Sequence, residues 1–250
     1  MSVETKSAAE IDVMAHAGRL LAEVHAALAQ AVAPGVSTAE LDGVAAAEIK
    51  ARKAKQAFLG YRGFPATLCV SVNNEVVHGI PCRTRRLEEG DLVSLDLGLI
   101  WKGFYADSAV TLPVGKVSPE AARLVETTRR SLAAGIAAAM VGGRIGDIGE
   151  AVQSVAEKDG YGVVREFVGH GIGRALHEDP PVPNYGKAGT GLRLAAGMVL
   201  AIEPMINAGG PDVKVLADGW TAVTADGALS AHFEHTVAVT EDGPRILTSY

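Results

Sequence analysis

The order of hydrophobic periodicities along this chain constrains its fold more than any other feature. Apolar residues recur at helical spacing in two pairs of segments, residues 9–32 and 38–53, then 118–140 and 147–160. β-Branched runs bounded by turn residues lie between and after these pairs, at 67–77, 92–99, 105–114, 198–206 and 232–240. Two helix pairs alternate with two strand blocks, which predicts an α+β fold with an antiparallel sheet.

The two strand blocks resemble each other. LVSLDLG precedes ADSAVTLPVG in the first block, and MVLAIEPMI precedes FEHTVAVTEDG in the second. In each block an apolar strand ends in a carboxylate, and a second strand has a carboxylate just before a β-branched run. The pattern is either chance or an internal duplication with a period of about 110–125 residues. No Pro-, Ser- or Gly-rich linker separates the halves, so we expect one domain over residues 1–250.

Composition narrows the classes of protein that fit. With 250 residues, 48% apolar and 21% charged, the chain is globular and long enough to fold without disulfides or a structural metal. A net charge of −6, from 23 basic and 29 acidic residues, argues against a broad nucleic-acid-binding surface. We find no signal-peptide pattern and no apolar run of membrane-spanning length. These features predict a cytoplasmic protein with no membrane partner and a flexible N-terminus at residues 1–8.

Four carboxylates interrupt apolar strand segments, where a charge is unfavourable unless it is paired or metal-bound. Asp96 lies within VSLDLG, Asp107 follows FYA, Glu203 lies within VLAIEPMI, and Glu234 follows a phenylalanine. An ion-pair network would need Lys or Arg residues interleaved with these acids, and the strands contain none. Four acids in one core repel each other, and a pair of divalent cations would convert that repulsion into coordination.

Three histidines occur in settings typical of functional sites. His170 lies in VGHGIG, where glycines let the backbone approach closely, His177 lies in ALHEDPP, and His78 closes NNEVVHGIP. One histidine with four carboxylates suits Mn²⁺, Fe²⁺ or Co²⁺ better than the Cys/His sets of structural zinc, and a bridged pair of such ions is a hydrolytic centre. Helix faces and strand surfaces accept imidazole readily, so three other histidines are expected to be structural: His16, His25 and His232.

These residues lie in six segments that together resemble the type I methionine aminopeptidases. The segments are GYRGFPATLCVSVNNEVVHGIP, DLVSLDLG, GFYADSAVTLPVG, VGHGIGRALHEDPPVPNYG, GMVLAIEPM and DGWTAVTADGALSAHFEHTVAVTEDG. The resemblance runs from about Ala8 to Thr248. It implies a pita-bread (creatinase/aminopeptidase-like) fold, whose two pseudo-symmetric halves would explain the repeat. Without a Cys-rich extension or a type II helical insertion, a bare type I catalytic domain is expected.

The resemblance also implies a ligand set for two divalent metal ions. By it, Asp96 chelates one metal, Asp107 and Glu234 bridge both, and His170 with Glu203 completes the second. Cobalt, manganese, iron, zinc and nickel are the candidate metals. Two such ions would hold a bridging water or hydroxide as the nucleophile for the scissile carbonyl.

Three of the residues receive catalytic roles from the same resemblance. Glu203 would accept the proton of the attacking water and pass it to the leaving amine. His177 would stabilise the oxyanion, and His78 would hydrogen-bond near the scissile nitrogen. The implied substrate is the N-terminal peptide of nascent proteins, from which the initiator methionine is removed when the second residue is small. The implied protein is a monomer, with the ribosome as a further candidate partner and no specific nucleic-acid target.

A substrate pocket of methionine size is carried over in the same way. Besides His78 and His177, its expected lining is Phe58, Tyr61, Phe64, Cys69, Leu176 and Trp220, an apolar and partly aromatic set. The family pattern has cysteine at position 58 and phenylalanine at 176, so both departures alter the pocket but keep it apolar. Cys69 is expected to be a packed thiol, not a nucleophile. Asn73 and Ser230 match positions that line a monovalent-cation site.

Sequence features distinguish two alternative functions from the metal-dependent aminopeptidase. An X-Pro aminopeptidase or prolidase of the same fold would be expected to carry an additional N-terminal domain, and about 90 residues before Asp96 leave no room for one. A non-catalytic peptide-binding protein of this fold would be expected to have lost metal ligands, and all five are present. The metal-dependent aminopeptidase is therefore the favoured hypothesis.

Overall fold

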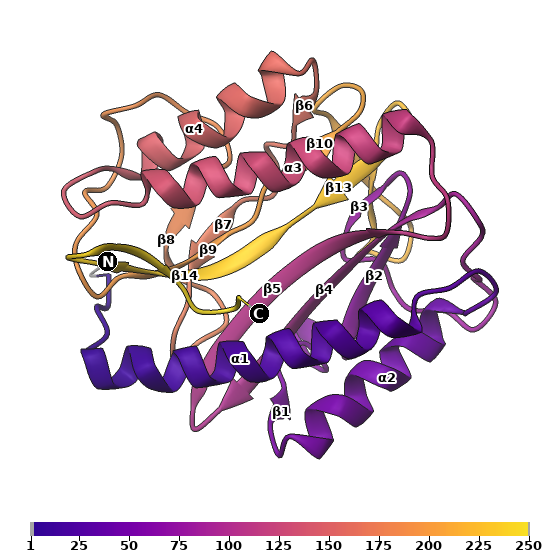
Figure 1. The fold of residues 1–250 in the computed structure, drawn as a ribbon, viewed down its shortest axis with the longest axis horizontal. Helices are drawn as coiled ribbons and strands as arrows, with labels where there is room; N and C mark the ends of the chain where they lie inside the picture. Colours follow the sequence, from indigo (N-terminus) through magenta and orange to yellow (C-terminus); the bar gives the residue numbers. More distant parts are fainter. Residues whose placement is uncertain (1–2, 250) are drawn as a thin grey trace.

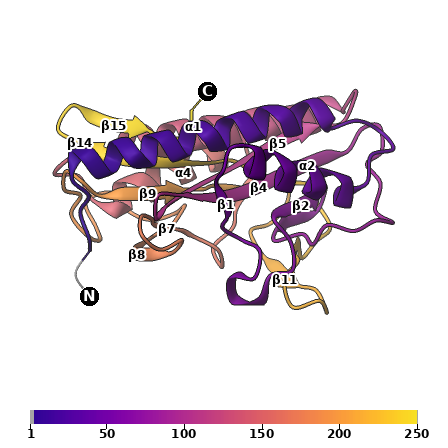
Figure 2. The same ribbon diagram turned by 90° about the horizontal axis from the view of Figure 1, so that it is seen from below.

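A computed structural model describes residues 3–249 of the chain. Four helices, α1 (Ala8–Ala31), α2 (Thr38–Ala51), α3 (Pro119–Ala138) and α4 (Ile145–Lys158), are present within these residues, and they cover one face of the main sheet (Figures 1 and 2). The first three begin at serine N-caps whose hydroxyls accept backbone N–H groups of the first turn.

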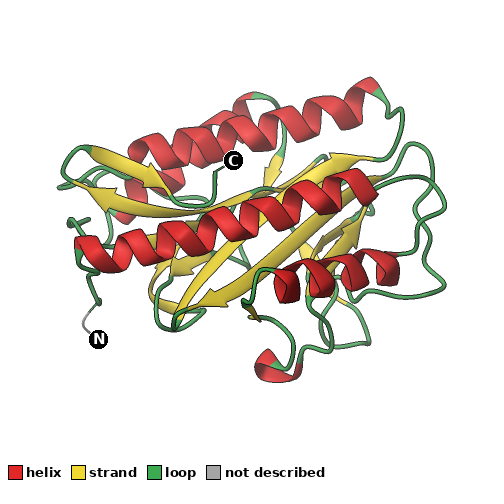
Figure 3. Cartoon of the chain, turned by 60° about the horizontal axis from the view of Figure 1, so that its bottom comes forward, coloured by secondary structure: helices red, strands yellow, loops and turns green. Residues whose placement is uncertain are grey.

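The main sheet of the described chain has the strand order β1–β4–β5–β14–β9–β7–β8, with β2 beside β4 and β15 beside β14. All of its pairs are antiparallel, which confirms the predicted α+β class (Figure 3). Its strands are β1 (Lys55–Gln56), β2 (Leu68–Val72), β4 (Leu92–Trp101), β5 (Phe104–Pro113), β7 (Gly169–Gly171), β8 (Glu178–Val182), β9 (Val199–Ile202), β14 (Glu234–Thr240) and β15 (Gly243–Ile246).

Two three-stranded sheets flank the main one. The first has the order β13–β10–β6, and the second has the order β11–β12–β3. Their strands are β3 (Glu75–Val77), β6 (Gly162–Val163), β10 (Met205–Asn207), β11 (Val213–Val215), β12 (Ala222–Thr224) and β13 (Ser230–His232), and a short 3₁₀ turn, η1 (Tyr61–Gly63), precedes β2. No helix among residues 3–249 is long and apolar enough to cross a membrane.

The internal repeat is visible in matching backbone hydrogen bonds. Gly35 N–H donates to Leu87 O at 2.7 Å, and Gly142 N–H donates to Leu194 O at 2.9 Å, two bonds related by 107 positions (142 − 35 and 194 − 87). Helices α1 and α3 end 107 positions apart (138 − 31). The second strand of each half is offset by more, because β10–β13 are inserted before β14. The chain therefore has two pseudo-symmetric halves that share one sheet.

The pleat of the strands separates the core from the site. In β4, Leu95, Leu97 and Leu99 are fully buried in one hydrophobic cluster with Leu21 of α1 and Leu41 of α2. Successive side chains alternate between the faces of a sheet, so residues at even positions of β4 point away from the helices. The four helices thus stabilise one face, and the opposite face is free to carry polar chemistry.

Several predicted boundaries are wrong in detail. Helix α4 begins at Ile145 and not at the predicted residue 147, so Asp147 lies in its first turn, where its carboxylate accepts the Arg144 N–H at 2.7 Å. The strand predicted at 198–206 is interrupted before Pro204, which has no N–H to donate to a ladder. Likewise, 67–77 is divided by a turn and 232–240 by Phe233.

The N-terminal segment departs from the expectation of flexibility over its described part. Lys6 is buried, its N–H donates to Gly197 O at 2.7 Å, and its ammonium forms an ion pair with Glu178. A second ion pair joins Arg174 to Glu10 of α1 at 2.5 Å. Residues 1–2 of the predicted flexible region lie outside the described residues. From Lys6 onward, the segment is packed against the loop between β7 and β8.

Candidate metal centre and active site

Strand register brings the predicted metal ligands to the face opposite the helices. Asp96 of β4 and Glu234 of β14 both lie opposite Ala109 of β5, and Asp107 precedes Ala109 by two positions on the same face. Ala201 of β9 lies opposite His170 of β7. Alanine at these two central positions leaves space between the longer acidic and imidazole side chains.

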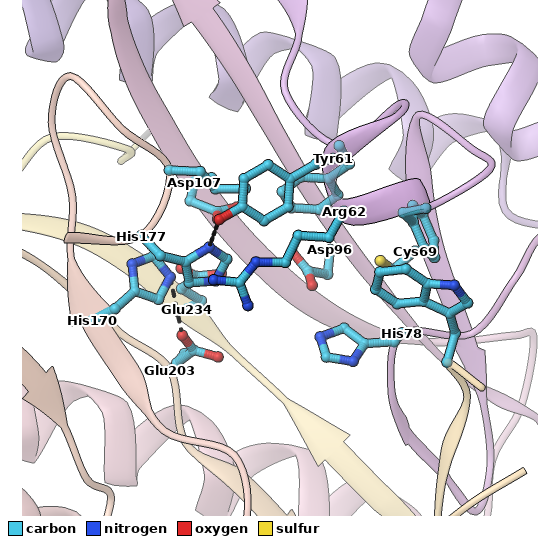
Figure 4. Close-up of a pocket in the computed structure, with 14 residues that line it drawn as sticks. Tyr61, Arg62, Cys69, His78, Asp96, Asp107, His170, His177, Glu203 and Glu234 are labelled. Atoms are coloured by element: carbon cyan, nitrogen blue, oxygen red, sulfur yellow. Dashed lines mark hydrogen bonds and ion pairs between the residues drawn. The ribbon is translucent and has the colours of Figure 1, made fainter.

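The five candidate ligands face one cavity (Figure 4). One ligand atom each of Asp107, His170 and Glu234 lies within 4.8 Å of the others. His170 Nε2 lies 3.5 Å from Glu203 Oε1, and His170 Nδ1 lies 2.9 Å from Gly171 O. Because a carbonyl only accepts, Nδ1 carries the proton and donates, which leaves the lone pair of Nε2 directed into the cluster.

The electrostatics of this cluster fit divalent cations. One carboxylate oxygen each of Asp96, Asp107 and Glu234 is buried without a hydrogen-bond partner. Burial raises the pKa of Asp107 to about 7 and, with the neighbouring carboxylates, raises the pKa of the other three acids well above their usual range. Burial lowers the pKa of His170 to about 3, so its imidazole is neutral. Unpartnered carboxylate oxygens and a neutral imidazole are the donors that a transition-metal ion needs.

Two threonines hold the site at the junction of the two halves. Strands β5 and β14 pair directly at two positions, and side chains extend this ladder in both directions. Thr236 Oγ1 accepts the Asp107 N–H at 3.1 Å and donates to Asp107 O at 2.8 Å. Thr111 Oγ1 accepts the His232 N–H and donates to His232 O, both at 2.8 Å. The backbone of a candidate ligand is therefore fixed where the strands diverge.

An apolar compartment adjoins the acidic cluster in the same cavity of about 140 Å³. All six expected pocket residues line it: Phe58, Tyr61, Phe64, Cys69, Leu176 and Trp220. Phe64 and Trp220 contact edge to face, with ring centroids 5.1 Å apart. Phe58 packs over Gly98 and Leu176 is buried, so both departures from the family pattern keep the lining apolar. Burial raises the pKa of the Cys69 thiol well above its usual value, as expected of a packed thiol.

His177 and His78 lie at opposite sides of the cavity. His177 Nδ1 is 2.8 Å from the Tyr61 hydroxyl, and its ring centroid is 4.2 Å from that of His170. Partial burial, with the nearby positive charge of Arg62, lowers the pKa of His177. His78 has a left-handed backbone (φ 61°), and burial lowers its pKa to about 4. Such strain in a non-glycine residue is typical of functional positions.

The two residues expected at a monovalent-cation site lie together but outside this cavity. Ser230 N–H donates to Asn73 O at 2.8 Å. The Asn73 amide donates to Asp91 and accepts the Leu92 N–H, and the Ser230 hydroxyl lies 2.9 Å from Asn207 Oδ1. A cation site at this position stays a prediction.

Two residues at the site were missed from the sequence. Arg62 lines the cavity, although nothing in its GYRGFP context separates it from a surface residue. His232, expected to be merely structural, is buried with Nε2 3.7 Å from Glu203 Oε2. No strand period could have identified it, because Phe233 separates His232 at the end of β13 from Glu234 at the start of β14.

Fold and site together define a metallopeptidase, and comparison with known proteins agrees. Residues 12–241 match the model of metallopeptidase family M24, and the chain belongs to that family. It is 49% identical to the methionine aminopeptidase of Clostridium acetobutylicum, over 97% of each chain, and 50% identical to methionine aminopeptidase 1 of Bacillus subtilis, over 97% of this chain and 98% of that one.

Solved structures agree on the pita-bread fold. The methionine aminopeptidase of Thermotoga maritima superposes with a TM-score of 0.98 at 43% identity, with 100% of each chain covered. A prolidase from Pyrococcus furiosus shares the fold with a TM-score of 0.79 at 21% identity. The match covers 98% of this chain and 65% of that prolidase.

Proposed function

We propose that this protein is a metal-dependent aminopeptidase that removes N-terminal methionine from proteins and peptides with a small second residue. The observation that carries the proposal is the single cavity in which unpartnered buried carboxylates adjoin an apolar, aromatic compartment of side-chain size. An ion site beside an apolar pocket is what an exopeptidase for a thioether side chain requires. The identity of 49–50% to the methionine aminopeptidases of Clostridium acetobutylicum and Bacillus subtilis supports the same conclusion.

Five residues would hold two divalent ions: Asp96, Asp107, His170, Glu203 and Glu234. Two bound cations supply Lewis-acid activation of the scissile carbonyl and of a water molecule. Glu203 would accept the proton of the attacking water at its carboxylate and deliver it to the leaving amine nitrogen. Titration of the chelator-stripped protein with Mn²⁺ is expected to show two equivalents of tightly bound ion; saturation at one would contradict the two-metal assignment.

The neutral side chains of the cavity orient the substrate. The Tyr61 hydroxyl lies 2.8 Å from Nδ1 of His177, and we assign the hydroxyl as the donor. The proton of this imidazole is then on Nε2, from which it donates to the carbonyl oxygen as negative charge develops. His78 hydrogen-bonds near the scissile nitrogen from the other side. The apolar compartment between Phe64, Cys69 and Trp220 takes the methionine side chain and excludes water.

The decisive test is peptide hydrolysis by chelator-stripped protein with Mn²⁺, Co²⁺ or Fe²⁺ added back. Release of methionine from Met-Ala-Ser is expected to depend on added metal and to exceed cleavage of Ala-Pro-Ser. Glu203→Gln is expected to lower kcat by roughly 10²–10⁴-fold, the usual contribution of general acid–base catalysis, while Glu241→Gln on an exposed turn has no effect. Preferred cleavage of Ala-Pro-Ser would favour the X-Pro alternative, and no metal-dependent hydrolysis would refute the proposal.

The setting of the reaction is part of the same proposal. We infer a monomer in the cytoplasm that meets its substrates as N-terminal peptides leaving the ribosome. The cytoplasm and the ribosome follow from the implied substrate, which exists from the start of synthesis, and the monomer follows from the resemblance to type I methionine aminopeptidases. Sedimentation of the protein alone and with purified ribosomes tests both statements: a monomer that co-sediments with translating ribosomes supports them, and a stable dimer or absence of co-sedimentation contradicts the respective one.

A further inference from the structure

Arg62 projects from a tightly constrained turn at the mouth of the cavity. Its backbone is left-handed (φ 50°), between two glycines that also have positive φ, Gly60 and Gly63. The turn is closed by hydrogen bonds from Gly60 N–H to Phe64 O at 2.8 Å and from Phe64 N–H to Tyr61 O at 2.9 Å. A left-handed conformation is unfavourable for arginine, so these hydrogen bonds hold the backbone of the turn in place.

The guanidinium of Arg62 lies over the cavity and carries an uncompensated charge. Figure 4 shows it reaching between His177 and His78, and its central carbon is 5.4 Å from the centre of the Tyr61 ring. Among residues 3–249, no acidic side chain forms an ion pair with it. Its positive charge contributes to the lowered pKa of His177. The mouth of an otherwise acidic and apolar cavity therefore presents one free cation.

We propose that Arg62 determines specificity by favouring peptides with an acidic side chain at the third position. This inference rests on the proposed aminopeptidase function and extends it to the residues after the scissile bond. The apolar compartment takes the first residue, and His177, beside Arg62, marks the position of the scissile carbonyl. Because the second residue is small, the first side chain able to carry a charge toward the mouth is the third.

The size of the preference follows from the exposure of the site. Arg62 is exposed, so its attraction to glutamate and its repulsion of lysine are each as weak as in a surface ion pair. Attraction raises kcat/KM for a glutamate peptide, and repulsion lowers kcat/KM for a lysine peptide. We therefore expect the ratio of the two values to be about three- to twentyfold at low salt. Screening at about 1 M NaCl, where the Debye length is about 3 Å, should remove most of the difference.

The test compares metal-loaded wild-type protein with Arg62→Gln and Arg62→Lys on Met-Ala-X-Ala-amide, where X is Glu, Gln or Lys. The C-terminal amide removes a terminal carboxylate that would itself meet Arg62. We expect the Glu/Lys ratio of kcat/KM to fall to about one in Arg62→Gln and to be retained in part in Arg62→Lys. Arg19→Gln, an exposed arginine of α1 on the helical face, is the matched control and should keep the wild-type ratio.

The possible outcomes separate this inference from the proposed function. Metal-dependent release of methionine from all three peptides at equal rates would overturn the acidic preference and leave the aminopeptidase function intact. A Glu/Lys preference that persists in Arg62→Gln would show that another residue reads the charge and would overturn the assignment to Arg62. No release from any peptide would refute the proposed function itself.

Discussion

The ion pair between Lys6 and Glu178 offers a sharp test of how the site is supported. The Lys6 side chain is 4% exposed and that of Glu178 14%, and the Lys6 ammonium also donates to Glu4 O at 3.1 Å. Glu178 in turn accepts the N–H groups of Arg174 at 2.7 Å and of Ala175 at 3.1 Å. The pair therefore joins the N-terminal segment to the loop that carries His177. Lys6→Met removes the charge and keeps most of the apolar stem.

The expected loss of folding stability in Lys6→Met follows from the Glu178 carboxylate, which is left without its partner. Removing one partner of a buried ion pair costs about 3–5 kcal/mol, because the remaining charge is desolvated. Glu178 keeps two backbone donors and some exposure, so Lys6→Met is expected near the lower end, about 3 kcal/mol. For a chain of this size, that corresponds to a fall in Tm of about 6–12 °C. The double variant Lys6→Met/Glu178→Gln should lose less than the sum of the singles, since neither charge is stranded.

Urea unfolding and peptide hydrolysis together provide the assay. Lys50→Met, at an exposed position of α2, controls for the loss of a lysine and should stay within about 0.5 kcal/mol of wild type. In folded Lys6→Met, kcat is expected to fall more than KM rises, because a loosened His177 loop weakens stabilisation of the transition state. Stability equal to that of Lys50→Met, or strict additivity in the double variant, would refute the reasoning.

Four further substitutions have distinct expected outcomes. Gly79→Ala would place a methyl group 2.2 Å from Val70 O, so we expect a loss of about 1–3 kcal/mol in urea unfolding; unchanged stability would contradict the close packing. Burial lowers the pKa of His25 from 6.5 to about 4. As pH falls, the unfolded chain therefore binds a proton at this residue before the folded protein does. The contribution of His25 to the free energy of unfolding is lost between about pH 6.5 and pH 4. The stability of His25→Leu should accordingly fall less steeply over that range, and parallel profiles for variant and wild type would argue against a neutral buried imidazole. His177→Ala should reduce kcat by about 10²-fold or more, and an unaltered kcat would rule out the oxyanion role. Tyr61→Phe should reduce kcat less, because the imidazole of His177 remains and only its tautomer is no longer fixed.

Much of the site was predictable because its residues carry local signals. A carboxylate in an apolar strand, as at Asp96, is conspicuous against its neighbours, and the structure places it in the cavity with the other four candidate ligands. Helix starts were predictable where a serine caps the first turn, as at Ser37. The start of α4 was missed because the N-cap residue is Arg144, whose backbone N–H donates to the Asp147 carboxylate and whose side chain gives no N-cap signal.

The apolar lining of the pocket was expected only from the resemblance to the type I methionine aminopeptidases. Local patterns in the sequence were enough to predict the alternation of helix pairs and strand blocks and the carboxylates placed within apolar strands. These follow from periodicity and from the cost of placing charge in apolar segments, which are properties of short stretches of chain. Three contacts are set only by the tertiary structure. Lys6 forms an ion pair with Glu178 next to the loop that carries His177, the Thr236 hydroxyl accepts the Asp107 N–H, and Arg62 lines the cavity. Each of these contacts joins residues whose positions are set by packing of distant segments, so no local pattern in the sequence could specify them.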